Sequence, residues 1–134
     1  MLNLSDVTVL VVEDDRNVGS TIKSMLIEMG ITDIMEANDG KQALEIIESA
    51  MGGLSLIICD WNMPRKSGLE LLREVRQVNS GLPFLMITAR ADADSIIAAK
   101  ESNVTGYIRK PFSFNDLETK VISIIRQRRF SLNK

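Results

Sequence analysis

The chain alternates between short apolar runs and longer segments in which apolar residues recur every three or four positions. Short runs rich in β-branched residues are typical of strands, and the longer spacing is typical of amphipathic helices. The pattern occurs five times and predicts strands at Val7–Val12, Asp33–Ala37, Leu54–Cys59, Phe84–Thr88 and Gly106–Ile108. Three of these runs are nearly all apolar, as expected of strands that helices cover on both faces.

Each predicted strand is followed by a segment with helical spacing. The first helix should end near Gly30, where a C-terminal cap belongs. The fifth should begin near Ser113, which forms a capping-box-like pattern with Asp116. We expect the three helices between them at Gly40–Ala50, Gly68–Val78 and Asp92–Ser102.

Alternating strands and helices favour a parallel sheet with right-handed crossovers and helices on both sides. Five such units fit a flavodoxin-like, three-layer α/β fold. The chain has 134 residues, the size of one domain. We expect a single domain at residues 1–126 and a short basic tail at residues 127–134.

Composition narrows the possible functions. Hydrophobic residues make up 45% of the chain and charged residues 25%, and the net charge of −2 gives no field that would draw the domain onto nucleic acid. The apolar runs are too short to span a bilayer. The single cysteine, Cys59, fits a reducing cytoplasm and should be a core residue. Because the chain has no histidine, triads with a histidine base and histidine-ligated zinc sites are excluded.

Chemically active side chains gather at the ends of the predicted strands. In open parallel sheets, ligands bind beyond the carboxyl ends of the strands. Clustered carboxylates imply a hard cation such as Mg²⁺, and an Asp beside it can act as a nucleophile towards a phosphoryl donor. A lysine and a threonine can hold the phosphoryl oxygens. The residues at these ends are Glu13, Asp14, Asp15, Asp60, Thr88 and Lys110.

Each of these residues also has a purely structural interpretation. Asp14, Asp15 and Asp60 could cap the turns after strands, and for Asp15 this is as good an explanation as a functional one. Thr88 could be an ordinary strand residue and Lys110 a solvated charge. Residues of matching chemistry at several strand ends favour a site.

Four segments resemble the receiver domain of response regulators, especially the stand-alone chemotaxis type, usually called CheY-like. They are VLVVEDD, ICDWNMPRKSG, MITA and GYIRKPF, in that order along the chain. The resemblance covers roughly residues 6 to 126. It implies the strand order 2-1-3-4-5, and a phosphoacceptor module with at most slow self-phosphorylation and self-dephosphorylation.

The resemblance also implies a phosphorylation site. Asp60 would accept a phosphoryl group from a partner histidine kinase or phosphotransfer protein. Asp14 and the backbone carbonyl of Asn62 would bind Mg²⁺ directly together with Asp60, and Glu13 would act through a metal-bound water.

The same resemblance implies how a phosphorylation signal would pass from the site to a partner protein. Thr88 and Lys110 would contact the phosphoryl group, and Tyr107 would change position on activation. The Lys110-Pro111 peptide bond would be cis. A downstream protein would bind on the face formed by the fourth helix, the fifth strand and the fifth helix.

Three further positions bear on the predicted site. Chemotaxis members have an acidic residue two positions after the threonine, whereas this chain has Arg90, a positive charge expected near the entrance of the site. Pro64 and Gly68 should shape the loop after Asp60, Pro64 by fixing its own φ and Gly68 by permitting a positive φ.

Other classes of function fit these residues less well. Haloacid-dehalogenase-type enzymes also use an Asp nucleophile and magnesium, but they need a second Asp two residues later, where this chain has Asn62. A scaffold that works without phosphorylation would not need the complete set of site residues. Only eight residues follow residue 126, so we expect no DNA-binding output domain. The chain could also be a receiver cut from a larger regulator or hybrid kinase.

Overall fold

The computed structural model describes residues 3–50, 52–90 and 92–132. Within those residues, strands and helices alternate along the chain as the sequence predicts. The elements are η1 (Leu4–Asp6), β1 (Thr8–Val12), α1 (Arg16–Glu28), β2 (Asp33–Ala37), α2 (Gly40–Ala50), β3 (Leu56–Asp60), α3 (Gly68–Val78), β4 (Phe84–Thr88), α4 (Ala93–Glu101), β5 (Gly106–Arg109) and α5 (Phe114–Leu132). The short 3-10 helix η1 was not predicted.

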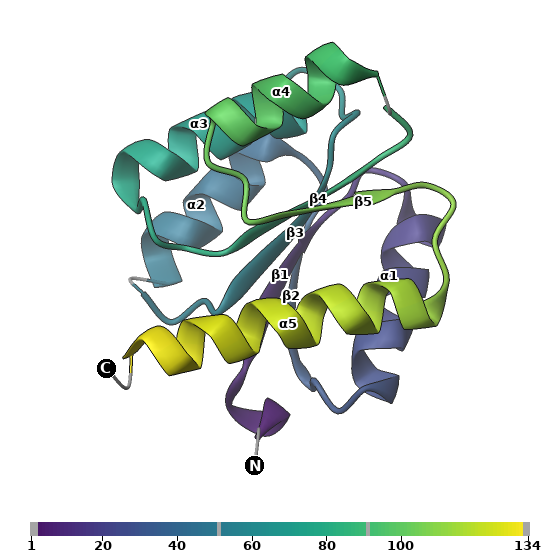
Figure 1. Cartoon of the computed structure of the whole chain (residues 1–134), viewed down its shortest axis with the longest axis vertical. Coiled ribbons are helices and arrows are strands. Elements are labelled where there is room, and N and C mark those ends of the chain that lie inside the picture. Colours follow the sequence, from purple (N-terminus) through teal and green to yellow (C-terminus); the bar gives the residue numbers. More distant parts are fainter. Residues whose placement is uncertain (1–2, 51, 91, 133–134) are drawn as a thin grey trace.

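The five strands form one parallel sheet in the order β2-β1-β3-β4-β5. Helices α1 and α5 cover one face, and α2, α3 and α4 cover the other (Figure 1). The predicted flavodoxin-like fold and its strand order are confirmed.

Strand β3 shows why its sequence is apolar at every position before Asp60. Side chains alternate between the two faces of a strand. Ile57 and Cys59 therefore pack under α2 and α3, whereas Leu56 and Ile58 pack under α1 and α5. All four are 0–1% exposed, and Cys59 is the core residue that was predicted.

Polar side chains just before α1, α3 and α4 act as N-caps of these helices. Asp15, Ser67 and Asp92 accept hydrogen bonds from backbone N–H groups in the first turns of α1, α3 and α4. The predicted cap of α5 is confirmed, because Ser113 N–H donates to the Asp116 carboxylate and Asp116 N–H donates to Ser113 Oγ. These caps satisfy donors that have no partner inside the helix.

Several predicted boundaries were wrong by one or two residues. Strand β1 begins at Thr8 instead of Val7, β3 spans Leu56–Asp60 instead of Leu54–Cys59, and β5 continues to Arg109. Helix α4 spans Ala93–Glu101, and the two residues at its predicted ends are its caps. Strand ends are set by pairing with the neighbouring strand, and a single apolar run does not carry that information.

The C-terminal ends of α1 and α5 can also be compared with the predictions. Gly30 follows the end of α1 with a φ of 106°, as its predicted capping role requires. Helix α5 continues to Leu132, so six residues of the predicted tail are helical. Arg128 in this last part donates to the carbonyls of Leu54 at 3.2 Å and Ser55 at 2.8 Å.

No helix among the described residues is long and apolar enough to cross a bilayer.

Candidate functional site

The strand register brings the predicted acids together at the carboxyl edge of the sheet. Val12, the last residue of β1, pairs with Cys59 of β3. The residues that follow this pair, Glu13 and Asp60, are therefore neighbours at the edge. Glu13 is held there by its own backbone N–H, which donates to the Ala37 carbonyl at 3.0 Å.

Glu13, Asp14 and Asp60 form a compact acidic cluster. One carboxylate oxygen from each lies within 4.8 Å of the others. Glu13 and Asp60 are only 6% and 7% exposed, whereas Asp14 is exposed. Three carboxylates this close repel one another unless a cation or a proton joins them.

Glu13 shows the effect of this crowding. Its Oε1 accepts a hydrogen bond from Asp15 N–H at 3.2 Å, but its buried Oε2 has no hydrogen-bond partner among the described residues. Burial and the nearby charge of Asp60 raise the pKa of Glu13 to about 7. An unpartnered carboxylate oxygen beside two other carboxylates fits a hard divalent cation such as Mg²⁺.

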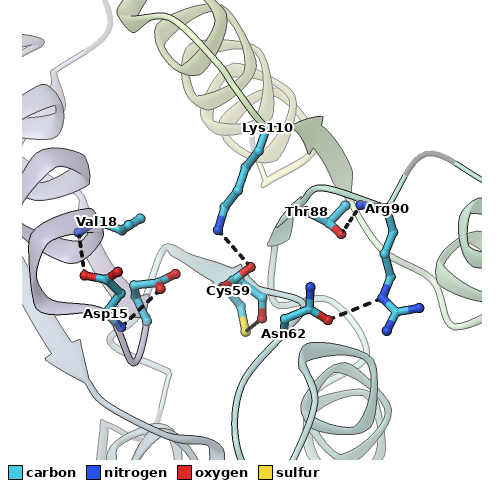
Figure 2. Close-up of polar contacts among 9 residues, drawn as sticks. Asp15, Val18, Cys59, Asn62, Thr88, Arg90 and Lys110 are labelled. Carbon is cyan, nitrogen blue, oxygen red and sulfur yellow. Dashed lines mark hydrogen bonds and ion pairs between the residues drawn. The ribbon is translucent and has the colours of Figure 1, made fainter.

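Lys110 lies on the other side of Asp60. Its Nζ is 3.2 Å from Asp60 Oδ1. The backbone N–H of Lys110 donates to the Thr88 carbonyl at 2.8 Å, which fixes the end of β5 against β4. Figure 2 shows Lys110 reaching this edge from the chain segment beside β5. The Lys110-Pro111 bond that follows is cis, as the resemblance implied.

Thr88 and Tyr107 both contact the backbone of Arg90. Thr88 is fully buried, and its Oγ1 accepts a hydrogen bond from Arg90 N–H at 2.8 Å. The half-buried Tyr107 donates its hydroxyl to the Arg90 carbonyl. Burial raises the pKa of Tyr107, and a hydrogen bond with the Thr88 side chain partly offsets this effect. The two predicted switch residues therefore lie together.

Arg90 also contacts the loop after β3. Its Nε donates to Asn62 Oδ1 at 3.3 Å (Figure 2). Its guanidinium lies 5.6 Å from the centre of the Trp61 ring. The sequence placed Arg90 near the entrance of the site. It gave no sign of these contacts, because they join two loops that are 28 residues apart.

The role predicted for Gly68 was partly wrong. The positive φ in this loop belongs to Arg65, at 70°. A Cβ on Gly68 would lie 2.5 Å from the Asp60 carbonyl oxygen and 2.9 Å from Trp61 Cα. Glycine is needed here because two backbone segments approach closely, which also lets Gly68 N–H donate to the Trp61 carbonyl at 2.7 Å.

Of the two interpretations left open for Asp15, the structure shows the helix cap. Its Oδ1 accepts from Asn17 N–H at 2.9 Å and from Val18 N–H at 3.4 Å. Asp15 therefore orients the start of α1, whereas Glu13 and Asp14 belong to the acidic cluster.

Together, the sheet order and this edge define a flavodoxin-like domain with an acidic site and a lysine at the carboxyl ends of its strands. The chain belongs to the response regulator receiver domain family, whose model matches residues 9–122. Domains of this family are phosphoacceptor modules with an acidic pocket for Mg²⁺.

Curated relatives point to the chemotaxis type of receiver. The chain is 39% identical to chemotaxis protein CheY of Pseudomonas aeruginosa over 121 residues, which are 89% of this chain and 96% of the relative. It is 36% identical to CheY-3 of Vibrio cholerae, over 89% of this chain and 92% of the relative.

Solved structures agree with the fold. A response regulator receiver domain protein from Clostridium thermocellum has a TM-score of 0.86 at 25% identity, covering 92% of this chain and 98% of the other. The response regulator TrrA from Thermotoga maritima, solved with Mg²⁺ and BeF, has a TM-score of 0.78 at 31% identity, covering 88% and 98%.

Proposed function

We propose that this receiver accepts a phosphoryl group on Asp60 from a partner histidine kinase or phosphotransfer protein, in a reaction that needs Mg²⁺. The observation that carries the proposal is the setting of Asp60. Its carboxylate is nearly buried, with Lys110 Nζ at 3.2 Å on one side and two further carboxylates within 4.8 Å. Residues 1–134 contain no histidine, so the phosphohistidine of the donor would lie outside this sequence.

The residues have distinct roles in the transfer. An Asp60 oxygen attacks the phosphorus atom and forms an acyl phosphate, while the bond from phosphorus to the donor nitrogen breaks and its electron pair returns to that nitrogen. Lys110 and the Thr88 hydroxyl hold oxygens of the transferred group. Such transfers depend mainly on positioning and charge neutralisation, which these side chains provide.

The metal-binding residues are those of the acidic cluster and the adjoining loop. Asp14, Asp60 and the backbone carbonyl of Asn62 would bind Mg²⁺ directly, and Glu13 would bind one of its waters. The ion, when bound, supplies positive charge that lets phosphoryl oxygens approach these carboxylates.

The signal would leave through Thr88 and Tyr107. A phosphoryl group on Asp60 would attract the Thr88 hydroxyl, and Tyr107 would move into the space that it leaves. A downstream protein would then bind the face formed by α4, β5 and α5. A hollow between β5 and α5, lined in part by Tyr107, Arg109 and Phe112, would form part of this surface.

We also propose that the receiver unit comprises residues 1–126 and that residues 127–134 are a short basic extension. The contacts of Arg128 with the Leu54 and Ser55 carbonyls would fasten this extension to the unit.

The phosphoacceptor assignment is tested by labelling with acetyl phosphate and Mg²⁺, followed by intact mass spectrometry. Wild type should gain one phosphoryl group, and Asp60→Asn should gain none. Asp15→Asn is the matched control, because asparagine can still cap α1 and this acid lies outside the cluster. Undiminished labelling of Asp60→Asn, or loss of labelling in Asp15→Asn alone, would contradict the assignment.

A further inference from the structure

Lys66 joins the loop after β3 to two neighbouring helices. Its Nζ forms an ion pair with the carboxylate of Glu74 in α3. Its side chain also lies against Gly40, the first residue of α2. A Cβ on Gly40 would be 2.7 Å from Lys66 Cδ, 3.0 Å from Cγ and 3.1 Å from Cβ. Glycine at position 40 therefore leaves the space that the Lys66 side chain occupies.

Lys66 directly follows a strained turn in this loop. Its backbone N–H donates to the Pro64 carbonyl at 2.7 Å, which closes a three-residue turn around Arg65. Arg65 has a φ of 70°, in the left-handed region that residues other than glycine seldom adopt. Such a backbone persists only where surrounding contacts hold it. The side chain of Lys66 supplies contacts of this kind.

The segments that Lys66 joins carry or hold residues of the proposed metal site. The loop after β3 includes Asn62, whose backbone carbonyl would bind Mg²⁺ directly. Helix α2 follows the end of β2, where the Ala37 carbonyl accepts from Glu13 N–H at 3.0 Å. A metal ion binds more tightly to ligands that are already held in place, because less freedom of movement is lost on binding.

We propose that Lys66 is a positioning residue for Mg²⁺. Its ion pair with Glu74 and its packing on Gly40, together called the Lys66 contacts, hold the Asn62 carbonyl where the ion binds. This inference rests on the proposed function, because it concerns the metal site beside Asp60. The side chains of Lys66 and Glu74 are 27% and 38% exposed, so their ion pair is partly shielded from water and salt.

The Lys66 contacts and the charge of Lys66 affect Mg²⁺ binding in opposite directions. A positive charge in this loop repels a cation, so by charge alone Lys66→Met would bind Mg²⁺ more tightly than wild type. If the Lys66 contacts position the loop, the same variant binds Mg²⁺ more weakly. Gly40→Ala gives a second test, because it displaces the Lys66 side chain and changes no charge.

The experiment is a Mg²⁺ titration followed by the fluorescence of Trp61, the single tryptophan, which adjoins Asp60 in the sequence. The dissociation constant should rise about threefold or more in Lys66→Met and in Gly40→Ala. Lys66→Arg keeps a cation on a long stem and should bind Mg²⁺ nearly as well as wild type. Urea denaturation with EDTA identifies the variants that are folded under the conditions of the titration.

Hydrogen exchange provides a measurement without metal. With EDTA present, the backbone amides of residues 61–68 should exchange faster in Lys66→Met than in wild type, because the loop has lost its ion pair. Wild-type exchange rates in Lys66→Met would overturn the proposal. A Lys66→Arg variant that binds Mg²⁺ as weakly as Lys66→Met would also overturn it, since arginine can still form the ion pair.

Arg65→Met is the matched control. It removes the same charge from the neighbouring residue, whose exposed side chain forms no hydrogen bond or ion pair with the described part of the chain. Methionine meets the same backbone conformation there as arginine, so the strain of the turn is unchanged. Its dissociation constant for Mg²⁺ should equal that of wild type or fall. A rise equal to that of Lys66→Met would overturn the role of the Lys66 contacts.

The remaining outcomes separate this inference from the proposed function. If wild type binds Mg²⁺ and Lys66→Met binds it as tightly or more tightly, the positioning role is wrong and the metal site stands. If Mg²⁺ changes neither the Trp61 fluorescence nor the thermal unfolding of wild type, the proposed metal site is wrong and the positioning role is wrong with it.

Discussion

Asp60 lies between opposite electrostatic influences. Glu13 and Asp14 place two further carboxylates within 4.8 Å, and Lys110 supplies one ammonium group at 3.2 Å. The cluster is thus short of positive charge, and its two nearly buried members are poorly screened by water. A residue in this setting is ready to share a cation and to react with a phosphoryl donor whose oxygens that cation can hold.

At the same scale, Gly68→Ala should destabilise the protein by about 1–3 kcal/mol. The added Cβ would lie 2.5 Å from the Asp60 carbonyl oxygen and 2.9 Å from Trp61 Cα, and these backbone atoms can move only if the site moves. Urea denaturation measures the loss. Gly81→Ala is the control, because the nearest atom to its added Cβ is Asn79 Oδ1 at 3.8 Å. Equal stability of the two variants would show that the loop accommodates the methyl group.

Among the elements, α3 is joined through Arg76 to the segments that precede β4 and β5. Its guanidinium donates to the carbonyls of Leu82 at 2.6 Å, Asn103 at 2.9 Å and Asn79 at 3.3 Å, and to Thr105 Oγ1 at 3.3 Å. Burial lowers the pKa of Arg76, but the group remains a cation at neutral pH. The bond to the Asn103 carbonyl holds the turn that follows α4.

We therefore expect Arg76→Met to reduce the free energy of unfolding by about 1–3 kcal/mol, because several acceptors lose their donor together. Arg73→Met should cost less than about 1 kcal/mol, because its bond to Ser102 Oγ is exposed. Chemical denaturation of both variants gives the comparison. A loss for Arg73→Met as large as that for Arg76→Met would mean that the larger number of Arg76 bonds has little effect.

Element prediction succeeded where the signal is local. The bounds of α2, α3, β2 and β4 match, because caps, turns and apolar spacing are written in neighbouring residues. It failed where contact with an element far away in the chain sets the boundary. The start of β3 depends on pairing with β1, and the last turns of α5 contact carbonyls before β3 through Arg128, which lies 74 residues away from Leu54 in the chain.

The site was predictable for a different reason. Parallel strands bring their carboxyl ends to one edge, so acids, a threonine and a lysine at those ends can be grouped without coordinates. The sequence could not predict the hydrogen bonding and the side-chain contacts of each group. The unpartnered Oε2 of Glu13 and the stack of Arg90 on Trp61 depend on side-chain directions in folded loops.

For the whole molecule, the acidic cluster links stability to pH. The pKa of Glu13 is raised from its usual 4.5 to about 7, so between these values the folded protein holds a proton that the unfolded chain has lost. Metal-free stability should therefore fall as pH rises through this window and level off above it. Asp92 and Asp116 have lowered pKa values, so their contributions are lost only as pH falls below their usual 3.8.

Magnesium should reverse this trend, because the ion and the proton compete for the same carboxylates. Thermal unfolding with Mg²⁺ and with EDTA, at about pH 5.5 and about pH 8, should show stabilisation by the metal that grows with pH. Glu13→Gln keeps the shape of the side chain and removes its titration, so its metal-free stability should depend less on pH, and its gain from magnesium should change less between the two pH values. If wild type and Glu13→Gln have the same pH dependence with EDTA, Glu13 is not the group that links folding to protons.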